Sequence, residues 1–578
     1  MLSIQELLKN EENLKRSKQV LASLRAAMSD SRWAAENKLS VEIQVLLAAY
    51  LFLCLEKSDD PLAVSYEEIR HGKLTIPPDL LALFLEAVPE EKWLELKNRF
   101  LGYSPEIWVT LIFLPIEETP STAISTPDSL VKLAKKLLCC SSRDKVADIG
   151  CGIGSFLLSA AMENPEAQYY GFDLARDYTI IARIRAEVMG VNIQIVIQDA
   201  FSLAENEERK FDKIFANYPL GARLTKTEPE NLFLETIKSQ CPEIEKSTSA
   251  DWIYNALLVQ LLNEGGKAVG IMTNGGTWNG NDESVRRYFI ENGFVECVIS
   301  MPSKLFLSTS IPTSLIVLSH KNRSVRLVDA TALYQKGRRQ NEFGEEDIRK
   351  ILYAVGTDCE YSREVSVEEL RENKYVLSLS RYGSTEDGNG VPLGEIASIS
   401  RGAPYTARQL DEMTSNSQTN FQYLMLSNIQ DGIIERDLPY LTSIAPKHEK
   451  YCLENGNLIL SKNGIPYKAA VVSLQNGQRI LASGNLYILR LDRGRVNPYY
   501  LKAYFESERG ADALKRISVG ASIPNISLEQ LKNLCIPLPD METQNSLATL
   551  YQAAQDKVIT LRQELNEAVE KLRHIFDL

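Results

Sequence analysis

A glycine-rich stretch between two apolar runs constrains the fold of this chain more than any other feature. Residues 146–154 have the sequence Val-Ala-Asp-Ile-Gly-Cys-Gly-Ile-Gly, and an apolar run resumes at 156–158. This pattern predicts a buried strand, a tight loop and the start of a helix. Glycine is needed where a backbone takes a positive φ or lies against a ligand. The spacing differs from the G-x-G-x-x-G of dinucleotide-binding folds, and it places Asp148 two residues before the first glycine. A glycine turn with a purely structural role is the alternative.

Strand and helix patterns alternate after this loop, and the expected strands end in carboxylates. The strands expected at 168–172 and 193–197 are followed by Asp173 and by Asp199-Ala200-Phe201. A carboxylate at the carboxyl end of a strand is placed to bind ribose hydroxyls, and an acid followed by an aromatic suits an adenine amine and ring. Each acid alone is more often a turn residue, but three at successive strand ends favour a cofactor site. The loop and the acids resemble the binding region of Rossmann-like methyltransferases for S-adenosyl-L-methionine (AdoMet). The resemblance implies a cofactor site formed by Thr126, Asp148, Gly150, Gly152, Gly154, Asp173, Asp199, Ala200 and Phe201.

The strand expected at 211–216 ends in Asn217-Tyr218-Pro219-Leu220. This resembles the Asn-Pro-Pro-aromatic motif of adenine-N6 and cytosine-N4 DNA methyltransferases. There the amide oxygen and the next backbone carbonyl accept the hydrogens of the target amine, and the aromatic stacks on the flipped base. The resemblance therefore implies that these four residues form the catalytic motif.

The chain departs from this motif at two positions. Tyr218 stands where the first proline is expected, and Leu220 stands where the aromatic is expected. A backbone carbonyl at position 218 survives any side chain, and the Tyr218 ring could supply the stacking face instead. Stacking on a base is worth roughly 1–3 kcal/mol, so its loss would slow the reaction rather than abolish it. The alternative is a protein that binds DNA without methylating it.

Residues 119–350 contain several motifs in a fixed order, and this region closely resembles the modification subunit of type I restriction-modification systems. Thr126 before Pro127 predicts the start of a helix, as in the segment that closes the AdoMet pocket of adenine methyltransferases. Asp251-Trp252, a strand at 297–301, a strand within 309–318 and the sequence at 337–341 follow in order. The resemblance implies a seven-stranded methyltransferase sheet and DNA adenine as the substrate.

Residues 391–540 resemble a target-recognition domain of type I specificity subunits. The matching segments are Leu393-Gly394-Glu395-Ile396-Ala397 with Arg401-Gly402, 456–461 with Gly464, 523–526 and 536–539. Base edges in the major groove are contacted by arginine, lysine, asparagine and glutamine side chains. The DNA-binding residues expected on turns of this domain are Arg401, Lys462, Asn463 and Lys468. Solvated surface is the alternative for each of them.

The chain ends in an expected long helix whose apolar residues recur in alternating steps of four and three. This seam consists of Leu547, Tyr551, Ala554, Val558, Leu561, Leu565, Ala568, Leu572 and Ile575. Such a heptad spacing is typical of coiled coils. We therefore expect a homodimer through these helices, and packing of the seam on its own chain is the alternative.

The length of the chain limits the number of its domains. A chain of 578 residues predicts about three to four domains. We expect a helical N-terminal domain (1–118), a methyltransferase domain (119–345), a connecting helix and linker (346–390), a target-recognition domain (391–540) and a C-terminal helix (541–578). The N-terminal helices are expected to form a packing domain or to close over the DNA or cofactor site.

Charge and cysteine usage narrow the function classes. The net charge of −12 lies in residues 1–390, since the rest is balanced. An acidic total argues against non-specific coating of nucleic acid, although a local basic groove is compatible with it. Nine cysteines without a C-x-x-C pair and four histidines argue against a metal site and favour reduced thiols in the cytoplasm. Neither a membrane span nor a signal peptide is expected.

The sequence thus predicts an α/β Rossmann-like AdoMet methyltransferase core with a helical N-terminal domain, an α/β target-recognition domain and a long C-terminal helix. The expected activity is sequence-specific methylation of adenine N6 in double-stranded DNA. Any cleavage would need a separate restriction subunit, because no nuclease signature is found. A non-catalytic, AdoMet-responsive DNA-binding protein is the alternative that the altered motif at 217–220 favours. Methylation of RNA or protein is opposed by the target-recognition domain.

Overall fold

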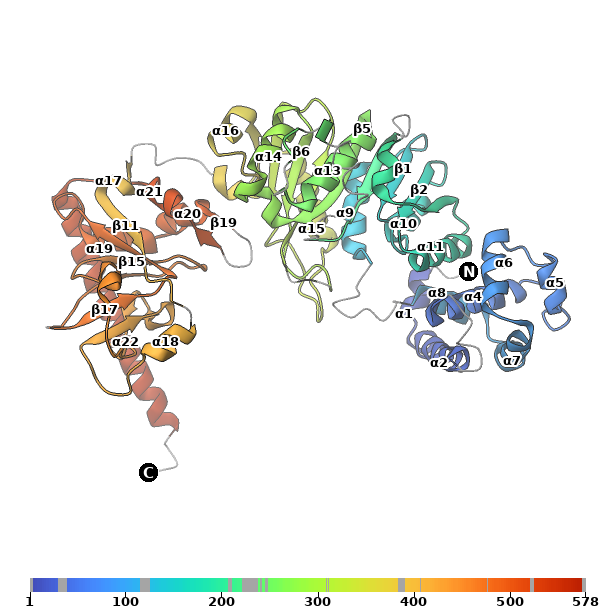
Figure 1. Cartoon of the computed structure of the whole chain (residues 1–578), viewed down its shortest axis with the longest axis horizontal. Helices are drawn as coiled ribbons and strands as arrows, with labels where there is room; N and C mark the ends of the chain where they lie inside the picture. The colour runs from blue at the N-terminus through green and yellow to red at the C-terminus, as the bar shows by residue number, and fades with distance from the viewer. Residues whose placement is uncertain are drawn as a thin grey trace. The chain divides into compact units, whose positions relative to one another are not determined.

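The computed structural model describes two compact units, Met1–Leu379 and Ser380–Leu578 (Figure 1). The described residues are 4–29, 39–114, 125–205, 210–220, 238–239, 242–244, 248–307, 309, 311–382, 390–405, 407–475, 477–519 and 524–573. Residues 383–389 of the connecting helix and linker expected at 346–390 lie outside these ranges, and so does Ile575 of the expected seam. The domain boundaries expected at 118, 345 and 540 stay predictions.

The first unit begins with helices that surround one apolar helix, α4 (Val41–Leu55). These are α1 (Ile4–Lys9), α2 (Glu11–Met28), α4 (Val41–Leu55), α5 (Tyr66–Arg70), α6 (Pro78–Ala87), α7 (Glu90–Phe100) and α8 (Pro105–Phe113). Helix α4 is buried around nearly its whole circumference. Its Phe52 stacks on Trp108 with ring centroids 4.7 Å apart and also contacts Trp93 at 5.0 Å. These aromatic contacts form the centre of the N-terminal core.

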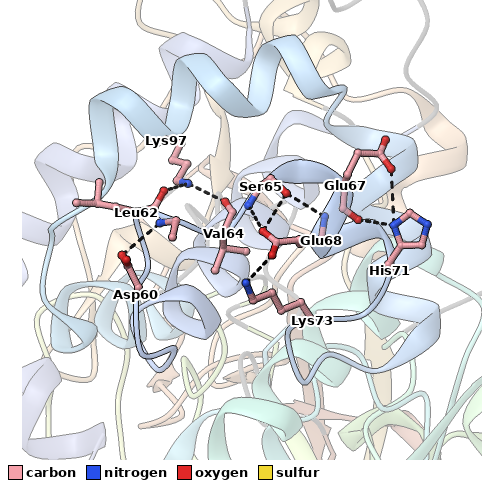
Figure 2. A network of polar contacts seen from close by, with 10 residues as sticks. Asp60, Leu62, Val64, Ser65, Glu67, Glu68, His71, Lys73 and Lys97 are labelled. Atoms are coloured by element: carbon pink, nitrogen blue, oxygen red, sulfur yellow. Dashed lines mark hydrogen bonds and ion pairs between the residues drawn. The ribbon is translucent and has the colours of Figure 1, made fainter.

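A polar network holds the loop between α4 and α5 (Figure 2). The Ser65 hydroxyl accepts a hydrogen bond from the Glu68 backbone NH at 3.2 Å, and Glu68 Oε2 accepts one from the Ser65 NH at 2.8 Å. Lys73 Nζ lies 2.6 Å from Glu68 Oε1, and these contacts lower the pKa of Glu68 to about 2. Lys97 of α7 donates to two backbone carbonyls of the same loop at 2.9 and 2.7 Å. The network is a helix cap and a loop clamp.

The N-terminal helices pack behind the glycine-rich stretch. Ile153 belongs to the apolar core of these helices, together with Ile180 and Ile184 of α11 (Arg176–Met189). Arg185 of α11 donates to the backbone carbonyl of Ile112 at 3.1 Å. The helical region therefore packs against α11 and against Ile153 of the loop expected to bind the cofactor.

A nine-stranded sheet in the order β3-β2-β1-β4-β5-β7-β6-β8-β9 forms the centre of the first unit. Its strands are β1 (Lys145–Ile149), β2 (Gln168–Asp173), β3 (Ile193–Ile197), β4 (Phe211–Ala216), β5 (Leu262–Thr273), β6 (Val295–Ser300), β7 (Thr313–Leu318), β8 (Ser324–Asp329) and β9 (Ser362–Ser366). Strands β1 to β5 are parallel, β7 is antiparallel to β5 and β6, and β6 is parallel to β8. The carboxyl ends of β1 to β6 and β8 therefore share one edge, and β7 ends at the opposite edge.

This order confirms the predicted Rossmann-like methyltransferase core. The seven expected strands are present in the order β3-β2-β1-β4-β5-β7-β6, and β8 and β9 extend the sheet beyond β6 to nine strands. Alternating side chains of β8, including Val325 and Leu327, are buried, and this burial stabilises the added strands. The other helices of this unit are α9 (Asp128–Leu138), α10 (Ser155–Glu163), α13 (Ala250–Leu261), α14 (Glu283–Glu291), α15 (Glu345–Gly356) and α16 (Val367–Glu372).

The second unit combines small sheets with helices. A four-stranded sheet has the order β11-β18-β15-β16, formed by β11 (Ala397–Arg401), β18 (Leu486–Leu491), β15 (Leu458–Ser461) and β16 (Ala469–Val471). The remaining strands are β10 (Val391–Pro392), β12 (Phe421–Leu424), β13 (Ile429–Gln430), β14 (Ile433–Ile434), β17 (Arg479–Ala482), β19 (Ser518–Val519), β20 (Asn525–Ile526) and β21 (Cys535–Ile536). The helices are α17 (Leu393–Ile396), α18 (Ala407–Met413), α19 (Pro498–Glu506), α20 (Glu508–Arg516), α21 (Leu528–Lys532) and α22 (Met541–Arg573).

The long C-terminal helix is confirmed as α22, which starts at Met541. Its first turns pack on α19, since Gln544 and Ala548 are buried and Lys502 Nζ contacts the Tyr551 hydroxyl at 2.9 Å. Within the described ranges, the chain contains no helix with the length and apolarity to cross a bilayer.

Candidate functional site

The glycine loop after β1 has the backbone that its sequence predicts. Gly150, Gly152 and Gly154 take positive φ values of 76°, 52° and 82°. The Gly150 NH donates to the Phe172 carbonyl of β2 at 2.9 Å, which draws the loop over the sheet edge. A Cβ on Gly154 would lie 3.2 Å from the Ala182 Cβ of α11. Any other residue at these positions would be strained.

Two of the expected acids are tied to the backbone of this edge. Asp173 accepts hydrogen bonds from the Gly152 NH and the Ala175 NH, each at 2.8 Å. Asp199 accepts one from the Phe201 NH at 3.0 Å. Asp173 and Asp199 thus each stabilise a turn, which is the structural role that the sequence offered as the alternative to cofactor binding. A carboxylate oxygen has two lone pairs, so this role leaves acceptors for ribose hydroxyls or an adenine amine.

Asp148 is the unusual acid of the three. Its side chain is 3% exposed, and its Oδ1 atom has no hydrogen-bond partner among the described residues. Burial and the negative charge of Asp173 raise the pKa of Asp148 well above its usual range. A cationic ligand at this edge would relieve both the missing hydrogen bond and the repulsion between the two carboxyls. AdoMet carries an ammonium and a sulfonium group, so the residues present fit this cofactor.

Asn217 follows β4 at the same edge as the glycine loop. Its Nδ2 atom donates to Thr126 Oγ1 at 3.1 Å, across 91 residues of sequence. A Cβ on Gly150 would lie 4.0 Å from the Asn217 backbone carbonyl. The structure therefore brings Thr126, the glycine loop and Asn217 together. Among the described residues, no donor binds the amide oxygen of Asn217, so it is available as an acceptor. Pro219 is exposed and Leu220 packs partly on the core.

The Tyr218 ring is buried and occupied by contacts within the chain. It is 3% exposed, and its hydroxyl donates to Asn255 Oδ1 at 2.8 Å. The ring stacks on Tyr254 at 4.5 Å, and Tyr254 stacks on Phe201 at 5.1 Å. The suggestion that Tyr218 replaces the missing stacking face is therefore wrong for this conformation. The reason is local space, since a Cβ on Gly270 of β5 would lie 3.3 Å from the Tyr218 hydroxyl.

Sequence reasoning missed the residues of α13 that support this edge. Tyr254 and Asn255 hold Tyr218, and Asp251 accepts hydrogen bonds from the Thr273 NH and hydroxyl at the end of β5. Burial raises the pKa of Asp251 to about 6. The Asp251-Trp252 pair marked this segment in the sequence as part of the family pattern. Local periodicity, however, does not show which side chains of a helix reach a neighbouring loop.

The four residues expected to bind DNA lie in the second unit. Arg401 ends β11 and donates through Nε to the Gly484 carbonyl at 2.6 Å. Lys462 and Asn463 follow β15, and burial together with the charge of Arg401 lowers the pKa of Lys462. Two cations thus face each other here. Lys468 is used inside the fold, because its Nζ donates to the Ile429 carbonyl at 2.6 Å.

No group of three or more His, Cys, Asp or Glu side chains with the arrangement of a metal site occurs in the described ranges.

Two family models match the chain from residue 119 onwards. Residues 119–389 match the family "N-6 DNA Methylase", and residues 389–571 match "Type I restriction modification DNA specificity domain". The chain is 26% identical over 304 residues to the type I restriction enzyme MjaVII methylase subunit of Methanocaldococcus jannaschii, which covers 48% of this chain and 51% of that protein. It is 24% identical over 267 residues to the MpnII methylase subunit of Mycoplasma pneumoniae, which covers 42% and 49%. The chain thus spans about half the length of these relatives.

Among solved structures, the type I restriction-modification system methyltransferase subunit from Streptococcus thermophilus has 20% identity and a TM-score of 0.48. The match covers 65% of this chain and 99% of that one.

Proposed function

Because this chain joins an N-6 DNA methylase region to a type I restriction-modification DNA specificity domain, we propose that it is a cytoplasmic, sequence-specific adenine DNA methyltransferase. It would transfer a methyl group from AdoMet to adenine N6 in double-stranded DNA. The observation that carries this proposal is the placement of Asn217 at the carboxyl end of β4, hydrogen-bonded to Thr126 and beside the glycine loop.

The chain's own residues would bind and orient the reactants. Bound AdoMet supplies an electrophilic methyl group. The glycine loop, Asp148, Asp173 and Asp199 would hold it, with Phe201 beside its adenine. The amide oxygen of Asn217 and the backbone carbonyl of residue 218 would accept the two hydrogens of the target amine, which directs the nitrogen lone pair. Positioning is sufficient for an amine nucleophile and needs no strong base.

The side chain at position 220 predicts a slower enzyme rather than a dead one. Leu220 offers an apolar contact to a flipped base but no aromatic face, so part of a stacking energy of roughly 1–3 kcal/mol would be lost. The chain would depend more on its second unit to hold the DNA.

The test is transfer of labelled methyl from AdoMet to unmodified duplex DNA, with identification of the methylated nucleoside. Label on adenine N6 supports the proposal. Absence of label, together with sequence-specific retention of DNA and measurable AdoMet binding, would contradict it. That result would leave an AdoMet-responsive DNA-binding protein.

We further propose that two copies pair through α22 and read a two-part target. The seam beyond the packed first turns is exposed: Val558, Leu561, Leu565 and Leu572 have exposed fractions of 47%, 53%, 62% and 67%. This exposure within the second unit supports a partner helix over the alternative of a seam buried on its own chain. Apolar side chains at heptad spacing gain most when a second helix covers them.

A separate restriction subunit would add DNA cleavage to the methylation proposed for this chain.

Substitution of two seam residues tests the homodimer. We expect the wild-type protein to have about twice the 64.9 kDa mass of one chain in light scattering, and the double variant Leu561→Glu/Leu565→Glu to have the mass of one chain. The matched control, Thr560→Glu/Gln563→Glu, adds the same charges to exposed positions off the seam and should stay dimeric. A wild-type monomer both with and without DNA would contradict the proposal.

A further inference from the structure

A tight hairpin projects from the sheet between β8 and α15. The backbones of Gln335 and Glu342 pair as an antiparallel bridge, with N–H···O distances of 2.8 and 3.1 Å. At its turn, a Cβ on Gly337 would lie 2.1 Å from the Gln340 carbonyl, so glycine is required there. Residues 335–342 are named the basic hairpin below.

The basic hairpin is fixed to the body of the sheet. Asn341 is 8% exposed, its backbone NH donates to the Lys304 carbonyl at 2.7 Å, and its Nδ2 atom donates to the Ser303 carbonyl at 2.9 Å. Leu333 and Phe343, on either side of the hairpin, are buried in the sheet core. Since the backbone is already ordered, little backbone conformational entropy is lost when the hairpin binds a partner.

The hairpin and its anchor expose four cations. Lys304, Lys336, Arg338 and Arg339 are all exposed, and none forms an ion pair with another described residue. The chain as a whole has a net charge of −12. These four cations lack carboxylate partners and therefore form a local basic surface. The acidic net charge of the whole chain does not reveal such a surface.

Topology places these cations at the edge that carries the candidate catalytic site. Strands β6 and β8 run in the same direction as β1 and β4, so the loops after β6 and β8 leave the sheet at the edge of the glycine loop and Asn217. The yellow-green loops beside α15 extend from this part of the sheet (Figure 1). Neighbouring strands are about 4.8 Å apart, so β8, four positions from β4, lies roughly 20 Å away. This distance is comparable to the diameter of a DNA duplex, so a single duplex could contact both places.

We propose that the basic hairpin and Lys304 bind phosphates of the DNA whose adenine enters the site at Asn217. This inference rests on the proposed function and names a second DNA contact, in the methylase unit rather than in the specificity unit. Arginine and lysine contacts to phosphate position a duplex without reading its sequence. Such positioning by the methylase unit would compensate for the missing aromatic face at Leu220.

The salt dependence of DNA binding by the full-length protein tests the inference. Each phosphate contact adds about 0.9 to the slope of log K against log [salt]. We expect Arg338→Ala/Arg339→Ala to flatten the slope by roughly 1.8, to raise the KM for DNA about tenfold or more at low salt, and to leave kcat and AdoMet binding unchanged. Arg338→Lys/Arg339→Lys should restore most of the slope, because a phosphate contact needs the charge.

The matched control removes two exposed arginines from the opposite edge of the same sheet. Arg143 precedes β1 and Arg323 follows the antiparallel strand β7. Arg143→Ala/Arg323→Ala should keep the wild-type slope. Equal slopes and KM values in the two double variants, with methylation intact, would overturn the hairpin contact alone. A flattened slope in a protein that binds DNA but transfers no methyl group would support the hairpin and contradict the proposed activity. A protein that does not bind duplex DNA would overturn both.

Discussion

Replacement of Asn217 by alanine is expected to reduce methyl transfer by roughly 10²–10³-fold, the range found when one preorganised hydrogen-bonding group is removed from a catalytic site. Asn217 holds its amide beside the glycine loop, and its Nδ2 atom donates to Thr126 Oγ1 at 3.1 Å. Alanine removes the amide oxygen that would accept an amine hydrogen. AdoMet binding and DNA retention should stay close to wild type, because the backbone at position 217 is held by β4. The measurement is single-turnover transfer of labelled methyl to duplex DNA.

Thr126→Val provides the matched control for Asn217→Ala. It removes the same hydrogen bond, whose net contribution is about 1 kcal/mol, but keeps the amide oxygen of Asn217. We expect transfer to fall by about tenfold or less. Asn217→Ala with nearly wild-type transfer would mean that another group holds the amine. Equal losses in the two variants would mean that Asn217 acts through Thr126 and not on the target base.

The parts of the site that sequence predicted well are those set by local backbone requirements. Three glycines with positive φ and apolar strands that end in carboxylates are properties of short segments. The strands at 193–197 and 211–216 have the predicted bounds, since a run of β-branched and aromatic residues between polar loops is sufficient to define a strand, whether it is largely buried like β4 or half-exposed at the sheet edge like β3. The side chains at the ends of parallel strands then meet at one edge by topology alone.

Long-range packing explains what sequence did not predict. The direction of the Tyr218 ring depends on the absence of a side chain at Gly270 and on the hydrogen-bond acceptor of Asn255, both far along the chain. The hydrogen bond from Lys468 Nζ to the Ile429 carbonyl likewise depends on a partner 39 residues away, and the role of Lys468 in DNA binding stays a prediction. The added strands β8 and β9 stabilise each other by pairing, which periodicity within either strand does not reveal.

Replacement of Asp148 by asparagine is expected to have opposite effects on stability and on cofactor binding. The side chain is 3% exposed, its Oδ1 atom lacks a hydrogen-bond partner among the described residues, and burial and the charge of Asp173 raise its pKa. A neutral amide of the same shape removes the charge that costs free energy at neutral pH. The thermal midpoint of the cofactor-free variant should therefore rise. AdoMet should bind about tenfold or more weakly, because a cationic ligand loses its buried counter-charge.

The sign of the pH dependence separates this explanation from a simple loss of contact. A carboxyl whose pKa is raised by folding keeps a proton that the unfolded chain has lost, in the window from about pH 4 up to the raised pKa. The free energy of unfolding of the cofactor-free wild type should fall as pH rises through that window. AdoMet affinity should rise over the same window, because the cation favours the ionised form. Both trends should vanish in Asp148→Asn and persist in Asp144→Asn, a change at the amino end of the same strand, where the carboxylate accepts the Ser141 NH at 2.7 Å. A cofactor-free Asp148→Asn protein that is less stable than wild type at neutral pH would show that Asp148 is stabilised by contacts within the chain and does not await a cationic ligand.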